Sequence, residues 1–422
     1  MMMDQLCSVP EAVADLKRGR MIVLIDDPDR ENEGDLVMLA QHATPEAINF
    51  MARHGRGLIC LPLPAGDCDR LELELQPRRH KTAFGTGFTI SIDAADAPGP
   101  GISAVARAHT VRRAANPETS GLDFNRPGHV FPLRAMDGGV LVRPGHTEAI
   151  LDLAALAGAR PAGVICEIMN DDSTMARTPD LHAFARRFDL KVCTIESLIA
   201  HRLKTERLIE TIELDVPMPT RHGPFMIHLF RSVLDGTEHI ALTTGIPSPA
   251  TSGGAPLEET AMVRLHSECM TGDVFHSLRC DCGEQRDAAL ERISQSGCGV
   301  LLYMRQEGRG IGLANKLRAY RLQDDGLDTV EANLRLGFPA DKRDYNIGAQ
   351  ILRFLGVRRM RLLTNNPTKV RALHVDDLHI VEQVPLEVPP NSASMRYLRT
   401  KRDKMGRSLT QLDAIAARID GT

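Results

Sequence analysis

The sequence predicts two α/β domains in tandem, each with a mixed sheet, over residues 1–204 and 205–422. Three observations lead to this prediction. The chain has 422 residues, which is more than one hydrophobic core usually holds. Short apolar runs that are typical of buried strands alternate with helical segments. A short charged helix end around residues 199–208 suits a domain boundary.

The composition limits the class of protein. Hydrophobic residues make up 43% and charged residues 25%, as in ordinary globular proteins. The formal net charge of −4 and the absence of Trp argue against a surface that coats nucleic acid or stacks bases. The sequence contains neither a run of eighteen apolar residues nor a secretory signal, so we expect no membrane partner. Nine unevenly spaced cysteines indicate reduced thiols and a cytoplasmic location.

The first half is predicted to alternate strands and helices. A short helix is expected over residues 11–18, and Thr44 followed by Pro45 starts another that runs toward His54. A further helix ends near residue 156. Apolar runs predict strands over residues 21–25, 36–40, 58–62, 88–92, 138–142 and 163–169.

A dense polar loop, residues 26–35, joins the first two predicted strands. Most acidic runs of this kind are solvated turns. Here the flanking buried strands would hold several carboxylates and Arg30 in place, as a magnesium or phosphate site requires. The sequence leaves both interpretations open.

Two other features of the first half suggest ligand binding. Residues 138–147 combine a predicted strand, a glycine turn and a helix start, where backbone N–H groups bind phosphate and Arg143 adds charged donors. Glu167 is the only charge in its apolar run, so it needs either a core partner or a function.

Three cysteines dominate the second half. Cys280 and Cys282 are separated by one residue, and Cys269 lies eleven positions upstream of Cys280. Three thiolates bind Zn²⁺ in tetrahedral geometry and leave a fourth position for water, which the ion makes more acidic. Cys298 could instead close a structural four-thiolate site. His266 or His276 could also be the fourth ligand.

The rest of the second half is predicted to be α/β as well. Strands are expected over residues 225–229, 239–242 and 300–304, and a helix begins at residue 283. Residues 245–256, rich in Pro, Ser and Gly, predict a surface loop. A glycine-rich loop over residues 305–312 allows close approach of a ligand. Thr364 and Lys369 flank a predicted helix start that suits a phosphate, although a lone Lys is usually a solvated surface residue.

The first half, over residues 8–203, resembles 3,4-dihydroxy-2-butanone-4-phosphate synthase. The motifs are Asp-Arg-Glu-Asn-Glu-Gly-Asp at residues 29–35 and the segments 125–133, 143–147 and 170–175. The resemblance implies Mg²⁺ or Mn²⁺ bound by Glu31 and His146, and catalysis by His129 and Glu167. It implies contacts to ribulose 5-phosphate from Arg30, Glu31, Asp35, Arg143, Pro144, Gly145, His146, Thr147 and Glu167.

The reaction implied for the first half is a rearrangement that expels formate. A chelated divalent ion makes the hydroxyls of an open-chain ketose more acidic, so a nearby His or Glu can remove a proton. The sequence departs from the family at Gly99 and Pro100, where the family has threonines, and at Ala106, where it has Asp. These departures put the activity of the first half in question.

The second half, over residues 208–407, resembles GTP cyclohydrolase II. The segments that match are residues 266–273, 278–283, 305–309, 328–333 and 363–369. The resemblance implies Zn²⁺ on Cys269, Cys280 and Cys282. It implies that GTP is contacted by Arg264, Leu265, His266, Ser267, Glu268, Gln285, Glu307, Gly308, Arg309, Thr329, Thr364 and Lys369.

The same resemblance implies that Asp341 is a proton acceptor and Arg343 a nucleophile. A guanidinium stays protonated, however, and a nucleophile needs a free lone pair. We therefore expect Arg343 to stabilise charge on the transferring phosphoryl group.

Together the two resemblances predict a homodimeric enzyme of riboflavin biosynthesis. It would convert GTP to 2,5-diamino-6-ribosylamino-pyrimidinone 5'-phosphate, formate and pyrophosphate. It would also convert ribulose 5-phosphate to 3,4-dihydroxy-2-butanone 4-phosphate and formate. The alternatives are an enzyme with only the GTP half active and a non-catalytic guanine-nucleotide sensor with structural zinc.

Overall fold

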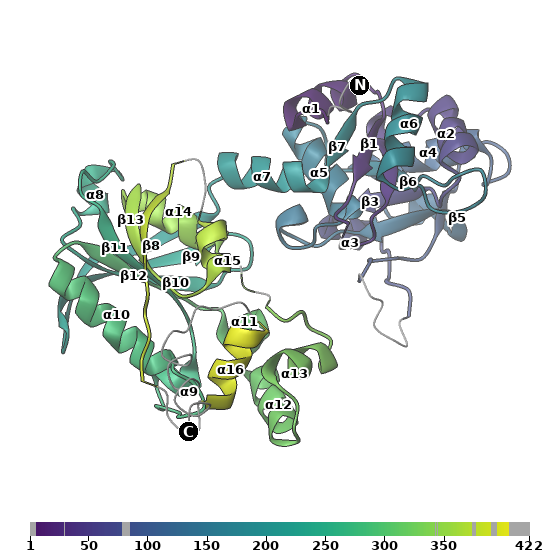
Figure 1. Ribbon diagram of the computed structural model, residues 1–422. Helices are drawn as coiled ribbons and strands as arrows, with labels where there is room; N and C mark the ends of the chain where they lie inside the picture. The colour runs from purple at the N-terminus through teal and green to yellow at the C-terminus, as the bar shows by residue number, and fades with distance from the viewer. Residues whose placement is uncertain are drawn as a thin grey trace. The chain divides into compact units, whose positions relative to one another are not determined.

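The computed structural model describes residues 6–28, 30–77, 85–341, 343, 345–373, 377–389 and 395–404. The chain forms two compact units, Met1–Glu206 and Arg207–Thr422 (Figure 1). Each unit is built on a mixed sheet in which the described residues form seven strands. The predicted fold class, two tandem α/β domains with mixed sheets, is confirmed.

The first unit contains strands β1 (Ile22–Ile25), β2 (Gly34–Leu39), β3 (Cys60–Leu63), β4 (Ile92–Ala94), β5 (Phe124–Arg134), β6 (Gly163–Glu167) and β7 (Val192–Thr194). They pair in the order β4-β5-β3-β6-β2-β1-β7. The helices are α1 (Val9–Lys17), α2 (Pro45–Phe50), α3 (Ala65–Arg70), α4 (Ala104–Ala115), α5 (His146–Leu156), α6 (Thr178–Phe188) and α7 (Ile195–Thr205).

Both faces of this sheet are buried, which explains why its central strands are continuous apolar runs. Val23 of β1 packs in one core with residues of α4 and α6. Its neighbour Leu24 points to the opposite face and packs with residues of α1, α5 and α7. The charged residues of β2 and β6 therefore lie at the strand ends. Asp35, near the start of β2, pairs with Glu167 at the end of β6, at the same edge of the sheet as the acidic loop.

Two strand predictions in the first unit need correction. The predicted strand 138–142 is wrong, because Gly138 and Gly139 adopt positive φ angles of 90° and 65° and a 3-10 turn, Gly139–Leu141, follows. The predicted strand 88–92 is reduced to isolated bridges at Phe88 and Thr89, and β4 begins only at Ile92.

The second unit contains strands β8 (Ile209–Thr220), β9 (Gly223–Ser232), β10 (Glu238–Thr244), β11 (Ala261–Ser267), β12 (Gly299–Met304), β13 (Arg359–Leu363) and β14 (His379–Val384). Their order is β14-β13-β11-β12-β10-β9-β8. The helices are α8 (Pro249–Ser252), α9 (Met270–Asp273), α10 (Cys282–Ser296), α11 (Glu307–Gly310), α12 (Gly312–Asp324), α13 (Thr329–Arg335), α14 (Asn346–Phe354), α15 (Pro367–Ala372) and α16 (Met395–Asp403). The predicted loop 245–256 thus contains the short helix α8.

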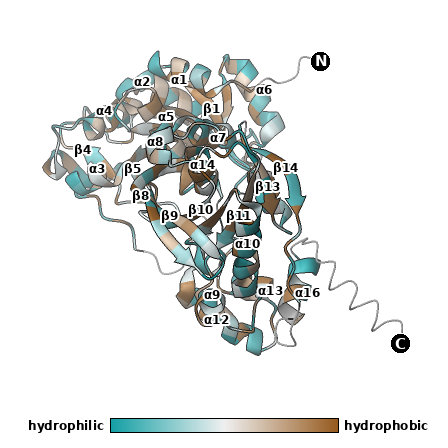
Figure 2. Cartoon of the chain, turned by 90° about the vertical axis from the view of Figure 1, so that its left-hand side faces the viewer, coloured by the Kyte–Doolittle hydropathy of each residue, from teal (hydrophilic) through white to brown (hydrophobic). Residues whose placement is uncertain are grey.

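Strands β11, β12 and β13 of the second unit are parallel, so their carboxyl ends meet at one edge. Figure 2 shows hydrophobic residues concentrated in β10 and β11, whereas α10 carries mostly hydrophilic residues on its visible face. Ligands of open α/β sheets bind at the carboxyl ends of parallel strands. Residues that follow β11, β12 and β13 are therefore the first candidates for a binding site.

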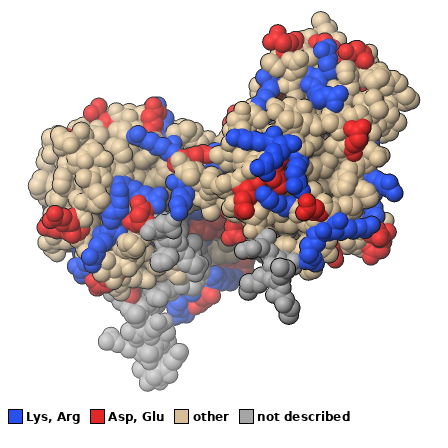
Figure 3. Space-filling view, turned by 90° about the horizontal axis from the view of Figure 1, so that it is seen from above, with Lys and Arg blue, Asp and Glu red and all other residues tan. Residues whose placement is uncertain are grey.

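Two expectations from the composition concern the distribution of surface charge and membrane-spanning helices. On the face in Figure 3, acidic and basic side chains are interspersed and do not form a continuous basic surface. Within the described part of the chain, we find no helix with both the length and the apolar character needed to cross a membrane.

Candidate functional sites

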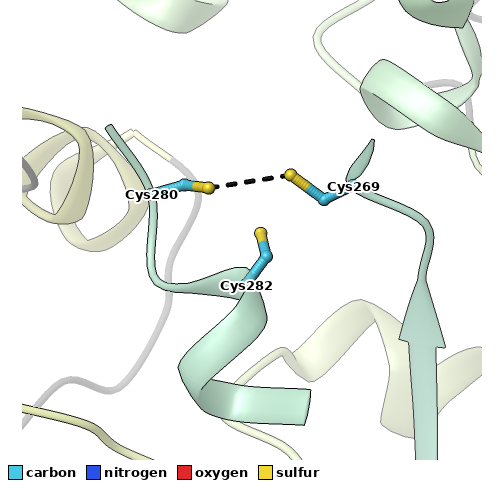
Figure 4. Close-up of side chains that lie close together, drawn as sticks. All are labelled: Cys269, Cys280 and Cys282. Atoms are coloured by element: carbon cyan, nitrogen blue, oxygen red, sulfur yellow. Dashed lines mark hydrogen bonds between the residues drawn. The ribbon is translucent and has the colours of Figure 1, made fainter. Parts of the chain in front are cut away.

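Three thiols converge at the carboxyl edge of the second sheet (Figure 4). The Sγ atoms of Cys269, Cys280 and Cys282 all lie within 4.8 Å of one another, and those of Cys269 and Cys280 are 3.6 Å apart. A Cβ atom at Gly272 would lie 2.8 Å from the Cys280 Sγ, so only glycine lets the loop close around the sulfurs. The donor set and its size fit Zn²⁺.

The candidates for a fourth ligand lie elsewhere. Among the described residues, the metal-competent group holds only the three thiols and includes neither Cys298 nor His276. His266 Nε2 is 3.0 Å from Asp273 Oδ1, and its ring stacks on Tyr303 at 5.5 Å. Three protein donors leave one position of a tetrahedral ion for water or substrate.

A buried lysine that sequence reasoning missed lies against this group. Lys316 Nζ donates to Cys269 Sγ at 3.1 Å and to Glu307 Oε1 at 2.8 Å. Hydrogen bonds from the thiols of Cys280 and Cys282, aided by the Lys316 ammonium, lower the pKa of Cys269 and favour its thiolate. Lys316 belongs to α12, and no local motif places it beside the cysteines. Only the fold brings it there.

The three thiols line a pocket that is partly open to solvent. Eleven other residues implied by the resemblance line it: Arg264, His266, Ser267, Glu268, Gln285, Glu307, Gly308, Arg309, Thr329, Arg343 and Lys369. Leu265 is instead buried behind the wall, where its carbonyl accepts a 2.6 Å hydrogen bond from Lys369 Nζ. Thr364 lines a smaller cavity that shares Arg264, Gln285 and Lys369 with the pocket.

The pocket wall contains Arg309, whose guanidinium donors can bind an anion. Gly308 and Arg309 both have positive φ, at 62° and 65°, and this turn directs Arg309 to the pocket. Within the described residues, no hydrogen-bond acceptor reaches its buried Nη1 and Nη2 atoms. Arg309 as a whole is half-buried, but buried guanidinium nitrogens without a hydrogen-bond acceptor are costly, and a phosphate is a ligand that these donors fit.

Asp341 and Arg343 form an ion pair beside the pocket. Arg343 Nε donates to Asp341 Oδ1 at 2.8 Å, and its Nη2 donates to Oδ2. Burial alone would raise the pKa of Asp341, but the Arg343 guanidinium outweighs burial and lowers it. Asp341 is therefore a weak base that fixes the orientation of Arg343.

The acidic loop of the first unit forms a second metal-competent group. Donor atoms of Asp26, Glu31 and His146 lie within 4.8 Å of one another. Asp26 was not among the predicted ligands, although the predicted loop contains it. Arg30 Nη1 donates to Asp26 Oδ2 at 2.8 Å and to Glu31 Oε2 at 2.5 Å. Asp29, in the same motif, lies outside the described residues.

His146 is held as a neutral ligand. Burial lowers its pKa to about 4, so the ring is uncharged near neutral pH. Its Nε2 is 3.2 Å from the Leu24 carbonyl oxygen, which accepts a hydrogen bond and therefore leaves the proton on Nε2. Nδ1, 3.8 Å from Asp35 Oδ1, keeps its lone pair. A neutral imidazole with two carboxylates fits a divalent cation such as Mg²⁺ or Mn²⁺.

Asp35 and Glu167 are cross-strand neighbours on β2 and β6. Asp35 Oδ1 and Glu167 Oε2 are both buried, and neither has a hydrogen-bond partner among the described residues. Burial, and next the Glu167 charge, raise the pKa of Asp35, and burial raises that of Glu167. Such a pair requires a shared proton, a cation or a hydroxyl-rich ligand.

The predicted glycine turn and helix start within residues 138–147 are present, and Arg143 forms hydrogen bonds within the first unit. Gly145 caps α5, and the buried Thr147 follows in the first helical turn. Arg143 Nη1 donates to Glu148 Oε2 at 2.6 Å and its Nη2 to Thr86 Oγ1 at 2.8 Å. Pro144, which lies between Arg143 and Gly145 in the sequence, is exposed.

His129 lies apart from these groups, on β5. Its Nδ1 is 2.7 Å from Asp93 Oδ2, and its backbone N–H donates to Asp93 Oδ1 at 2.9 Å. The side chain is 48% exposed, so the imidazole is accessible, as a proton carrier needs to be. Within the described residues, the structure does not bring His129 into the metal-competent group.

The segment that departs from the family borders this histidine. A Cβ atom at Gly101 would lie 2.6 Å from His129 Nδ1 and 2.1 Å from Asp93 Oδ2. Gly99 has a φ of 74° and open space beside it, and Ala106 is fully buried in α4. Ser103 still caps α4 by accepting from the Ala106 N–H at 3.2 Å. The local fold therefore tolerates the departures.

Comparisons with known proteins cover both units. The family model of 3,4-dihydroxy-2-butanone 4-phosphate synthase matches residues 10–201, and that of GTP cyclohydrolase II matches residues 210–385. Riboflavin biosynthesis protein RibBA of Bacillus cereus (strain AH187) is 55% identical over 95% of this chain and 98% of its own length. The same figures hold for the RibBA protein of Bacillus cytotoxicus.

One solved structure spans most of the chain. It is RibBX, a two-domain 3,4-dihydroxy-2-butanone 4-phosphate synthase from A. baumannii, with 35% sequence identity and a TM-score of 0.66. The match covers 90% of this chain and 100% of that one.

Proposed function

The chain belongs to the family of bifunctional riboflavin biosynthesis proteins, in which a 3,4-dihydroxy-2-butanone 4-phosphate synthase is joined to a GTP cyclohydrolase II. From this premise we propose which residues carry each reaction. The observation that carries the assignment is the three-thiol group of Cys269, Cys280 and Cys282. It lines a pocket in which Nη1 and Nη2 of Arg309 have no hydrogen-bond acceptor among the described residues.

In the second unit, we assign Zn²⁺ to the three thiols and GTP to the pocket. When bound, the ion would supply an acidified water for hydrolysis at C8 of guanine. Arg309 and Lys369 bind the triphosphate, since both line the pocket, Lys369 is buried, and the buried Nη1 and Nη2 atoms of Arg309 have no acceptor among the described residues. Lys316 offsets one thiolate charge. The products are the pyrimidinone 5'-phosphate, formate and pyrophosphate.

In the first unit, we assign Mg²⁺ or Mn²⁺ to Glu31 and His146, with Asp26 as a further ligand, and ribulose 5-phosphate as the substrate. When bound, the ion would make the ketose hydroxyls more acidic. Glu167, whose pKa burial raises, takes and returns the proton near the metal. Asp93 holds His129 for a second proton transfer.

Arg343 separates two mechanisms for pyrophosphate release. If it stabilises charge, Arg343→Lys should keep kcat within about tenfold, whereas Arg343→Met should lose about 10²-fold to 10³-fold, as for one preorganised donor. Steady-state kinetics with GTP measures both variants. As a control, formate release from ribulose 5-phosphate should not change in either. A phosphoramidate trapped on Arg343 during turnover would show that the residue is a nucleophile instead.

A formate assay on the purified full chain tests the assignment. With Zn²⁺ and Mg²⁺ present, we expect formate from GTP and, in a separate reaction, from ribulose 5-phosphate. Formate from GTP alone would show that the changes at Gly99, Pro100 and Ala106 disable the first unit. The double substitution Pro100→Thr and Ala106→Asp should then recover that activity. Formate from neither substrate would contradict both assignments and favour the nucleotide sensor.

We further propose a domain boundary, a location in the cell and an oligomeric state. The domain boundary is placed after residue 204, close to the division of the compact units at Glu206 and Arg207. A cytoplasmic location is supported by the nine cysteines, all of which are free. A homodimer is proposed from the family resemblance.

A further inference from the structure

Helix α16 lies against the GTP pocket although it follows the region that the family model matches, which ends at residue 385. Figures 1 and 2 both show α16 beside α13. Lys404, directly after α16, donates to Glu331 Oε1 at 2.9 Å and also pairs with Asp328. Asp328 caps α13, whose first residue, Thr329, lines the pocket. One end of α16 is thus fixed to a pocket wall.

A second contact joins α16 to the cysteines. Lys401 Nζ lies 2.5 Å from Asp281 Oδ1, and the two side chains are only 5% and 4% exposed. Asp281 is the residue between Cys280 and Cys282. Its other oxygen, Oδ2, accepts a 2.6 Å hydrogen bond from Gln285 Nε2. Lys401 of α16, which lies 120 positions after Asp281 in the sequence, therefore contacts the segment Cys280–Cys282 that carries two of the three thiols.

The charge of Asp281 explains why such a contact is needed. A buried carboxylate between two metal-binding thiolates adds negative charge where negative charge is already concentrated. Lys401 offsets this charge and also lines both the pocket and the smaller cavity beside Thr364. Without the ammonium, the carboxylate would turn toward water and pull the Cys280–Cys282 segment with it.

We propose that α16 is a strap across the nucleotide site and that Lys401 is a positioning residue for the zinc ligands. The inference rests on the proposed function of the second unit. Lys401 acts through Asp281 and does not itself bind the ion. It belongs to the surroundings that orient metal ligands, whose loss typically costs about tenfold to a hundredfold in metal affinity.

The test is the rate at which the full-length protein releases Zn²⁺ to a chelator, together with the spectrum of the Co²⁺-substituted protein. Lys401→Met should release Zn²⁺ about tenfold faster or more and should change the cobalt–thiolate bands. Lys401→Arg keeps the charge and should restore part of the retention. Arg399→Gln removes an exposed charge from the same helix and should behave as wild type.

The outcomes are distinguishable. If Lys401→Met and Arg399→Gln release Zn²⁺ at the same rate as wild type, the strap is refuted while the proposed function stands. A wild-type protein that neither binds Zn²⁺ nor releases formate from GTP overturns the proposed function itself. Should the Met variant fail to fold, Lys401→Gln is measured instead. If neither variant folds, Lys401 is a general core residue and the positioning role is refuted.

Discussion

Replacing Cys282 with serine should remove Zn²⁺ from the second unit and lower formate release from GTP by about a thousandfold or more. A metal-bound water supplies several kcal/mol of the catalytic effect, and about 4 kcal/mol corresponds to that factor. A serine hydroxyl is a much poorer ligand than a thiolate, and the two remaining thiols cannot hold the ion in tetrahedral geometry. Zinc content by elemental analysis and formate release from GTP are the two measurements.

Cys298→Ser is the matched control for this change. Cys298 is also buried in the second unit, but it lies outside the three-thiol group. Zinc content and GTP turnover should therefore stay close to wild type. Formate from ribulose 5-phosphate should be unaffected by either substitution, because the first unit has its own site. Loss of zinc in Cys298→Ser would instead indicate a closed, structural four-thiolate centre.

The thiol group could be predicted from sequence because its signal is local. Two of its members are separated by a single residue and the third lies eleven positions upstream, so the short connecting segments keep the three thiols close in space. The buried strands could be predicted for a similar reason, since burial on both faces leaves an unbroken apolar run. The acidic loop was recognisable because two such strands enclose it.

The remaining site residues depend on packing between distant segments. Lys316 and Lys401 reach Cys269 and Asp281 only through the fold, and a lysine in a helix gives no sign that it is buried. Asp93 pairs with His129 across a strand ladder whose register the sequence does not reveal. The mistaken strand at 138–142 has a local cause, because two consecutive glycines can adopt left-handed angles that an apolar pattern cannot disclose.

Asp35→Asn should stabilise the metal-free first unit at neutral pH while reducing formate release from ribulose 5-phosphate by about a hundredfold or more. Asp35 is fully buried, and its Oδ1 has no partner within the described residues. Leaving a buried polar group unsatisfied costs about 1–3 kcal/mol, and more if it is charged. An amide removes the charge, so the variant should unfold less readily once the metal has been chelated.

The pH dependence of this gain has a definite sign. Burial and the Glu167 charge raise the folded-state pKa of Asp35, so the folded protein holds the proton more tightly than the unfolded chain. The wild type is therefore favoured at low pH. The wild type loses stability as the pH rises from the ordinary pKa of Asp35 in the unfolded chain through its raised pKa in the folded protein. The advantage of Asp35→Asn should grow over the same interval and vanish in acid.

Hydrogen exchange of the β2 and β6 amides measures this difference in the full chain. Intrinsic fluorescence would not report on the first unit, because all four tyrosines lie in the second half and the sequence has no Trp. Comparing variant and wild type at each pH cancels the intrinsic exchange rates. Asp137→Asn, which alters an exposed carboxyl, is the control and should be neutral throughout.

Saturating Mg²⁺ should reverse the order of stability, since an ion that binds only the folded state stabilises it by mass action. The Asn variant lacks the carboxylate whose Oδ1 lies 3.8 Å from His146 Nδ1, so it should gain less from that binding. A variant that is less stable than wild type without metal would show that Asp35 is satisfied in the fold and needs no ligand. If the variant is more stable without metal but less active, Asp35 is not satisfied in the metal-free fold. The carboxylate then serves ligand binding and lowers the stability of the first unit.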